Sequence, residues 1–220
     1  MNNMNTLFSS VRVLIWDFDG TFYEPNPELF HAVRESEYRT IMEKTGWDRQ
    51  KTITEFEKNY KKVTPSATQT VAKLSGISTT EAALIMENYF DRREYVKPDD
   101  KLIRLFASLK HFRHFILANG TARRLKETLL VLGVAESVFE EIVTSEVAGE
   151  NKPSDKGFRY IMQKTGLPAS SHMMIGDREA VDLVPARKLG IHTCLVWSEE
   201  KSAVADVTLS TVYEVADLLI

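Results

Sequence analysis

The stretch that decides the fold is Val11-Arg12-Val13-Leu14-Ile15-Trp16-Asp17-Phe18-Asp19-Gly20-Thr21. Its apolar first half predicts a short buried β-strand, and the strand ends in two carboxylates that lie on the same side of the pleat. A glycine then lets the chain turn away. Because neighbouring acids repel each other unless a cation or a shared proton relieves them, we interpret Asp17 and Asp19 as a functional site.

A simple Asp-Gly turn between two strands is the alternative interpretation of this stretch. A second acidic strand end argues against it, since the apolar run 172–175 leads into Gly176-Asp177 and, five residues later, Asp182. Parallel sheets in open α/β folds gather functional residues at the carboxyl ends of their strands, so the two acidic ends can meet. Oxygen ligands of this kind suit Mg²⁺, which we expect as the cofactor.

The rest of the chain alternates strand and helix patterns. Strands are predicted at 11–16, 114–118, 141–144, 172–176, 191–197 and 206–209, and helices at 99–110, 121–132, 154–164 and 178–189. Alternation of this kind predicts an α/β fold with a parallel, doubly wound sheet, and the right-handed crossover rule places helices on both faces.

Residues 22–97 break this alternation, because they contain no strand candidate and carry repeated helix punctuation. Asn26-Pro27 has the form of an N-cap followed by proline, and Ser78 begins a capping-box pattern. Gly46 and Gly76 have the form of helix stops. We therefore expect an inserted all-helical subdomain of about four helices.

Composition favours a compact enzyme. With 220 residues, 43% of them hydrophobic, the chain can bury a core as one domain plus a modest insert. A net charge of -3 gives no basic field for nucleic acid. No apolar run reaches the roughly 20 residues of a bilayer span, and residues 1–10 lack signal-peptide features, so we expect a cytoplasmic protein without a membrane partner. The single cysteine, Cys194, is expected in the core, and His114 on the surface.

Four motifs in order give the chain a resemblance to a known family. They are Asp17-Phe18-Asp19-Gly20-Thr21, Leu117-Ala118-Asn119-Gly120, Lys152-Pro153, and Gly176-Asp177 with Asp182. The chain resembles the haloacid dehalogenase (HAD) superfamily, in the subgroup with a helical cap between the first and second motifs. The resemblance implies a Rossmann-like core of residues 1–21 and 98–220 with a mobile cap at 22–97.

The resemblance also implies roles for the motif residues. Asp17 would attack phosphorus, and Asp19 would protonate the leaving oxygen and then activate water, which calls for a carboxyl that titrates near working pH. Lys152 would neutralise the transferring phosphoryl group, although a lysine alone before a helix is usually solvated. Mg²⁺ would be held by Asp17, the backbone carbonyl of Asp19 and Asp177, with Asp182 holding it through water or supporting Asp177.

One position departs from the family pattern. The second motif normally ends its strand in Ser or Thr, whose hydroxyl bonds the phosphate, and here that residue is Ala118. The backbone amides of Asn119 and Gly120 can still bind phosphate at the start of the next helix. Thr121 is a candidate to replace the hydroxyl, but capping the helix is its commoner role.

Three functions fit these motifs. A Mg²⁺-dependent phosphatase of small phosphorylated metabolites fits best, because both acids of the first motif are present; a dehalogenase or a phosphonatase would lack the second. A phosphomutase of the phosphoglucomutase type shares all four motifs. A weakly active or non-catalytic module that binds a phosphate ligand is favoured only by Ala118.

Substrate specificity is expected to lie in the cap. Its basic side chains are candidates for contacts with a second anionic group of the substrate, although helices of this kind carry many solvated basic residues. The candidates are Arg34, Arg39, Lys44 and Arg49. Phe22 and Tyr23, which join core to cap, either line the entrance or pack there.

Overall fold

The computed structural model describes residues 7–220 and contains a six-stranded parallel sheet. The sheet order is β3-β2-β1-β4-β5-β6, so the acidic strand β1 lies at the centre between β2 and β4. The strands are β1 (Val13–Trp16), β2 (Arg113–Leu117), β3 (Glu141–Val143), β4 (His172–Gly176), β5 (His192–Leu195) and β6 (Val207–Thr208). The predicted α/β fold with a parallel sheet is confirmed.

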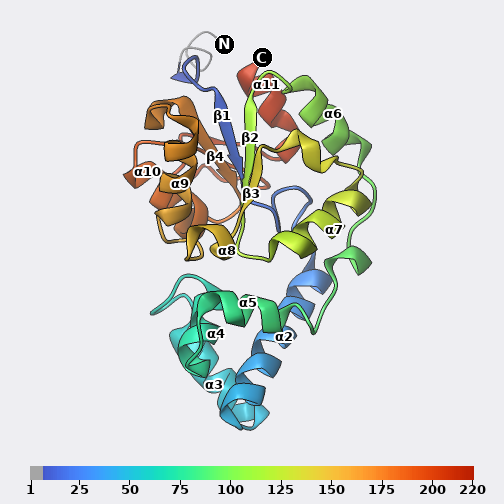
Figure 1. Ribbon diagram of the computed structural model, residues 1–220, viewed down its shortest axis with the longest axis vertical. Coiled ribbons are helices and arrows are strands. Elements are labelled where there is room, and N and C mark those ends of the chain that lie inside the picture. The colour runs from blue at the N-terminus through green and yellow to red at the C-terminus, as the bar shows by residue number, and fades with distance from the viewer. Residues whose placement is uncertain (1–6) are drawn as a thin grey trace.

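Helices cover both faces of this sheet (Figure 1). On one side lie α6 (Asp100–Ser108), α7 (Ala122–Leu132) and α11 (Val215–Leu219), and on the other α9 (Lys156–Thr165) and α10 (Val184–Lys188). The short α8 (Ser145–Ala148) lies at the carboxyl end of the strands. A π-helical turn, η4 (Glu179–Leu183), precedes α10. The chain also forms several short 3-10 turns. These are η1 (Arg92–Glu94), η2 (Glu136–Val138), η3 (Ala169–Ser171) and η5 (Val212–Glu214).

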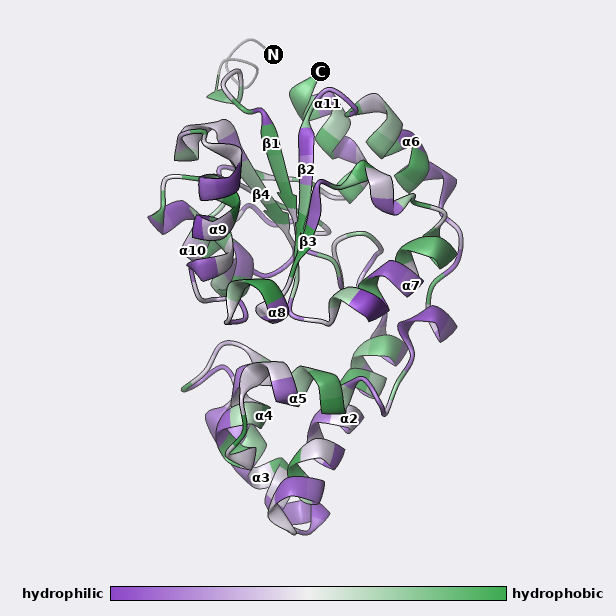
Figure 2. Ribbon diagram, viewed as in Figure 1, coloured by the Kyte–Doolittle hydropathy of each residue, from purple (hydrophilic) through white to green (hydrophobic). Residues whose placement is uncertain are grey.

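Alternate residues of β1 enter two separate apolar cores. Leu14 and Trp16 pack in the core on the α6, α7 and α11 side, whereas Val13 and Ile15 pack in the core on the α9 and α10 side. This is the period of two that a strand imposes on its side chains, and both faces are apolar because helices bury both. The strands are accordingly hydrophobic at the centre of the molecule (Figure 2).

Four helices lie together at one end of the molecule, beyond the carboxyl ends of the strands (Figure 1). They are α2 (Pro27–Thr45), α3 (Arg49–Asn59), α4 (Ala67–Ser75) and α5 (Thr79–Met86). The Asn26 side chain caps α2 as predicted, and Gly46 ends it in the left-handed region at φ 70°. This group packs its own apolar cluster around Ile41, Phe56 and Val71. The cluster supports a separate cap, while the exact boundaries at 22 and 97 stay a prediction.

Two single-residue expectations have different outcomes. Cys194 is buried in the core, as predicted. The prediction for His114 is wrong, because its side chain is buried between the sheet and helix α6. Its Nδ1 accepts a hydrogen bond from Trp16 Nε1 at 3.1 Å, and its Nε2 lies 3.0 Å from the Leu109 carbonyl oxygen. Burial lowers the pKa of His114, so the ring is neutral and structural.

Within residues 7–220, we find no helix with the length and apolarity of a membrane span.

Candidate active site

The register of the central strands brings three motifs to one edge of the sheet. Trp16 is paired with Ile116 on one side and Ile175 on the other, so the three chains leave the sheet at the same level. Asp17 follows directly, Ala118 and Asp177 come two residues after Ile116 and Ile175, and the backbone amide of Asp17 donates to the Ile175 carbonyl at 2.9 Å. The parallel topology therefore brings together the acidic strand ends that the sequence placed far apart.

Lys152 is the buried cation of this edge. Its side chain is 1% exposed, and its Nζ atom lies 2.6 Å from Asp17 Oδ1 and 2.6 Å from Asp182 Oδ1. Asn119 holds the backbone of Lys152 in place, because its side-chain oxygen accepts from the Lys152 amide and its Nδ2 donates to the Lys152 carbonyl. The solvated alternative for Lys152 is excluded by this burial.

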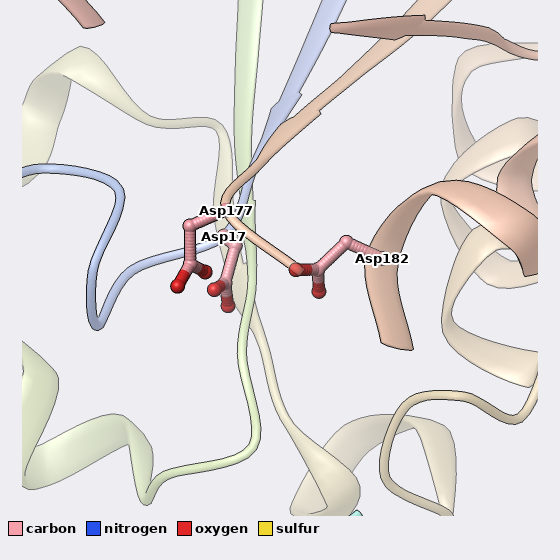
Figure 3. A group of neighbouring side chains, drawn as sticks. All are labelled: Asp17, Asp177 and Asp182. Atoms are coloured by element: carbon pink, nitrogen blue, oxygen red, sulfur yellow. The ribbon is translucent and has the colours of Figure 1, made fainter. Parts of the chain in front are cut away.

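Asp17, Asp177 and Asp182 turn their carboxyl groups toward one another (Figure 3). One oxygen from each lies within 4.8 Å of the others. Asp17 Oδ2 and Asp177 Oδ1 are buried without a hydrogen-bond partner. Burial, together with the neighbouring carboxylates, raises the pKa of Asp177 well above its ordinary value despite the charge of Arg178. Buried carboxylate oxygens that accept no hydrogen bond, in a cluster of acids, fit a hard divalent cation such as Mg²⁺.

Close packing keeps this cluster in place. A Cβ atom on Gly20 would stand 2.6 Å from Asp177 Oδ2, and Gly20 itself has a φ of 80°. Only glycine adopts that backbone conformation at little cost and also leaves room for the carboxylate. Asp182 Oδ2 accepts from the Arg178 amide at 3.1 Å, so its direct contacts are Lys152 and this backbone. A role for Asp182 in metal binding stays a prediction.

Asp19 has partners that the sequence did not indicate. The Arg92 Nε atom donates to both of its carboxylate oxygens, and the Tyr23 hydroxyl donates to Oδ1. Burial acts to raise the pKa of Asp19, but Arg92 and Tyr23 outweigh it and the pKa is lowered. The expectation that Asp19 titrates near neutral pH is therefore wrong for this arrangement. Phe22 is fully buried in the core.

Arg92 and Glu87 form a buried link between the cap and the second motif. Arg92 Nη1 donates to Glu87 Oε1 at 2.9 Å, and the same oxygen accepts from the Thr121 amide at 3.0 Å. The Thr121 hydroxyl also donates to Glu87, and it makes no capping hydrogen bond although Thr121 is the N-cap of α7. The capping interpretation of that hydroxyl is thus wrong, and its role toward a phosphate stays a prediction. Nothing in the local sequence distinguishes Arg92 from the adjacent Arg93.

A cavity of about 300 Å³ lies between the acidic edge and the cap. Asp17, Asp19 and the second motif line it from the core, and Arg34, Glu37, Tyr60 and Arg92 are among the residues that line it from the other side. The second motif contributes Ala118, Asn119 and Gly120. Ala118 is buried at 4% exposure and occupies the position where the family pattern has Ser or Thr.

Of the four basic cap residues named from the sequence, Arg34 lines this cavity. The other three have partners elsewhere. Arg39 lies over the Tyr89 ring, Lys44 pairs with Glu81, and Arg49 pairs with Glu35. Their positions agree with the ordinary role of basic residues on a helix surface.

Comparison with known proteins agrees with this architecture. The chain matches the family model of haloacid dehalogenase-like hydrolases over residues 11–190, and it belongs to that family. It is 28% identical over 109 residues to a glyceraldehyde 3-phosphate phosphatase of Methanocaldococcus jannaschii, covering 47% of each chain. A protein of the same name from Methanopyrus kandleri is 24% identical over 194 residues, covering 83% of this chain and 82% of that one.

The matched region thus spans about half the length of the first relative and most of the second. Among solved structures, a HAD phosphatase from Thermococcus onnurineus superposes with a TM-score of 0.66 at 17% identity, over 94% of this chain and 97% of that one. This likeness shows a shared fold.

Proposed function

We propose that the chain is a Mg²⁺-dependent phosphatase of small phosphorylated metabolites that works through an aspartyl-phosphate intermediate. One observation carries the proposal. Asp17 has one carboxylate oxygen held by Lys152, while the other is free of hydrogen bonds in a residue that lines the cavity. A carboxylate fixed in this way by a buried cation has one oxygen left for attack on phosphorus.

The residues around Asp17 support the steps of this reaction. The Asp17 carboxylate attacks the phosphorus, and the bond from phosphorus to the ester oxygen breaks. Lys152 orients Asp17 and offsets charge on the phosphoryl group. Asp19 gives the leaving oxygen a proton and then accepts one from the water that hydrolyses the aspartyl phosphate. Mg²⁺, held by Asp17 and Asp177, would supply positive charge that lets an anionic ester approach a carboxylate.

The cavity size and the relatives support a small substrate. A volume of about 300 Å³ lies at the lower end of ligand pockets, which supports a small substrate. Two relatives are named as phosphatases of glyceraldehyde 3-phosphate, a three-carbon phosphate ester. Short-chain phosphate esters are therefore the first substrates to test.

A weakly active module that binds a phosphate ligand is the second candidate function. Two observations favour it: Ala118 lacks the phosphate-binding hydroxyl, and Arg92 holds Asp19 in an ion pair that lowers the pKa of its carboxyl. A carboxyl group with a lowered pKa is almost fully ionised at neutral pH, so little of it carries a proton to donate. Turnover decides between the two functions.

The test is release of inorganic phosphate from a panel of phosphate esters, with Mg²⁺ and with a chelator. Wild-type protein should release phosphate only with the metal, and Asp17→Asn should lower kcat by at least about a thousandfold, or roughly 4 kcal/mol. Full activity of Asp17→Asn would exclude Asp17 as the nucleophile. An isomeric ester in place of free phosphate would identify a phosphomutase, and ester binding without turnover would identify the binding module.

A further inference from the structure

The cap side of the cavity contains a buried acid without a hydrogen-bond partner. Glu37, on helix α2, is 3% exposed and lines the cavity. Its Oε2 atom accepts no hydrogen bond, and the nearest cation, Arg34 Nη1, stands 3.2 Å away and is also buried without a hydrogen-bond partner. The two atoms form an ion pair, but neither makes a hydrogen bond, so both keep hydrogen-bonding capacity that a ligand in the cavity could use.

Aromatic rings hold Arg34 in position. Its guanidinium carbon lies 4.4 Å from the centre of the Phe56 ring and 4.6 Å from that of the Tyr60 ring. Cation–π contacts of this kind fix the plane of the guanidinium and limit its movement. Because α2 presents both residues to the cavity, Arg34 and Glu37 form a preformed pair rather than two mobile surface side chains.

The net charge of this part of the cap is negative. Arg34 faces two carboxylates, since Glu57 Oε1 lies 3.8 Å from the same Nη1 atom that faces Glu37. Burial raises the pKa of Glu37 to about 7, against the opposing charges of Arg34 and Arg178. Arg178 belongs to the core, and the carboxylates that it faces are those of Asp17, Asp177 and Asp182 at the acidic edge.

We propose that Arg34 and Glu37 form a subsite for the leaving group of the substrate, which selects a neutral, hydroxyl-bearing group and disfavours a carboxylate. A hydroxyl can donate to Glu37 and accept from Arg34 at once, and vicinal hydroxyls can use both residues. A carboxylate would accept from Arg34 only by approaching Glu37, a like charge in a buried site. The inference rests on the proposed phosphatase function and names the substrate class, polyol and sugar phosphates.

The test compares two three-carbon esters that differ in charge at the far end, glycerol 3-phosphate and 3-phosphoglycerate. Their kcat/KM values are measured on wild type, Glu37→Gln and Glu57→Gln with Mg²⁺ at about pH 8, where a carboxyl with a pKa of about 7 is mostly ionised. Glu57→Gln is the matched control, because Glu57 also faces Arg34 but is exposed and does not line the cavity. The ratio of the two substrates within one variant cancels any difference in folded fraction.

Wild type should prefer glycerol 3-phosphate, and Glu37→Gln should shift the ratio toward 3-phosphoglycerate by at least about tenfold, whereas Glu57→Gln leaves it near the wild-type value. An unchanged ratio in Glu37→Gln, or an equal shift in both variants, would overturn the subsite while leaving the phosphatase function intact. If wild type hydrolyses no ester, the proposed function fails. Calorimetric affinities of the two esters for the same three proteins then decide the subsite by the same ratio.

Discussion

Arg92 donates from Nε to both carboxylate oxygens of Asp19, at 2.8 and 2.9 Å. The guanidinium is buried, with its side chain 8% exposed, and Glu87 pairs with its other edge. Asp19 is the residue to which we assign proton transfer, so its charge state depends on an arginine of η1, the short turn that follows helix α5. A shift of this segment during catalysis would release Asp19 and let its pKa rise.

The first prediction concerns the pH dependence that Arg92 imposes. Arg92→Met combined with Glu87→Gln removes the ion pair with Asp19 without leaving Glu87 as a second unpaired carboxylate. Because the charge of Arg92 lowers the pKa of Asp19, its loss should raise that pKa. The limb of the kcat/KM profile that Asp19→Asn abolishes should therefore move to higher pH.

Glu87→Gln alone is the control, since it keeps the contact between Arg92 and Asp19, and its profile should stay near that of wild type. The ion pair between Arg92 and Asp19 also makes the stability of the fold depend on pH. A lowered carboxyl pKa stabilises the fold above the ordinary value of 3.8 and loses this contribution as the pH falls through the lowered pKa. If the kcat/KM profile of the double variant has the same pH dependence as wild type, Arg92 does not control the pKa of Asp19.

The second prediction concerns the metal cluster. Asp177 lies beside Asp17 and Asp182, and a bound cation would relieve the repulsion between these carboxylates. Asp177→Asn should therefore raise the Tm in a chelator and abolish the gain in Tm that Mg²⁺ gives wild type. For a ligand at 100 times its Kd, that gain corresponds to about 2.7 kcal/mol.

Thermal unfolding with and without Mg²⁺ measures both effects. The control is Asp217→Asn, which removes an exposed carboxylate of α11, and this variant should respond to Mg²⁺ as wild type does. An equal Mg²⁺ response in Asp177→Asn would show that the ion binds elsewhere.

Much of this architecture could be predicted from the sequence, because strands and helix ends are local patterns. The strand at β4, predicted at 172–176, has those bounds, and Asn26 and Gly46 bound α2 as expected. The sequence also predicted that the acidic ends of β1 and β4 lie close together, because parallel strands have their carboxyl ends at the same edge of a sheet. Strand β1 is shorter than predicted, because Val11 is buried but lies outside the sheet pairing.

Contacts between distant segments could not be predicted in the same way. Arg92 and Glu37 have no local signature, since their roles depend on the angle at which cap and core face each other. The sequence pointed to basic residues of the cap, yet an acid, Glu37, is its most deeply buried charge in the cavity wall. His114 was misplaced for a related reason: its partner Trp16 lies 98 residues away.

The third prediction concerns proton transfer by Asp19. If Asp19 protonates the leaving oxygen, Asp19→Asn should lower kcat/KM for an alkyl phosphate more than for an activated aryl phosphate, whose leaving group needs little protonation. The difference should reach at least about tenfold, within the range of general acid catalysis. Equal losses on both esters, with formation of the aspartyl phosphate shown to limit the rate, would contradict this role.

The last prediction rests on Ala118, whose methyl group lies in the cavity wall beside Asn119 and Gly120. The neighbouring Thr121 hydroxyl donates to Glu87 and is not available to a phosphate in this arrangement. Ala118→Ser adds one oxygen beside the cavity, so its steric cost is small. A hydrogen bond to a charged group contributes about 1.5 to 3 kcal/mol, so kcat/KM on the best substrate should rise between about tenfold and a hundredfold.

Ala107→Ser, on the exposed face of α6, makes the same chemical change away from the cavity and should leave kcat/KM unaltered. A gain in Ala118→Ser alone would identify an enzyme weakened by one missing donor, in agreement with the phosphatase proposal. No change would mean that another donor already serves the phosphate, for which Arg92 is placed, since its Nη2 would lie 3.2 Å from a Cβ on Gly120. A clear loss would mean that the substrate occupies the space beside the Ala118 methyl group, and our assignment of that position to the phosphate would then be wrong.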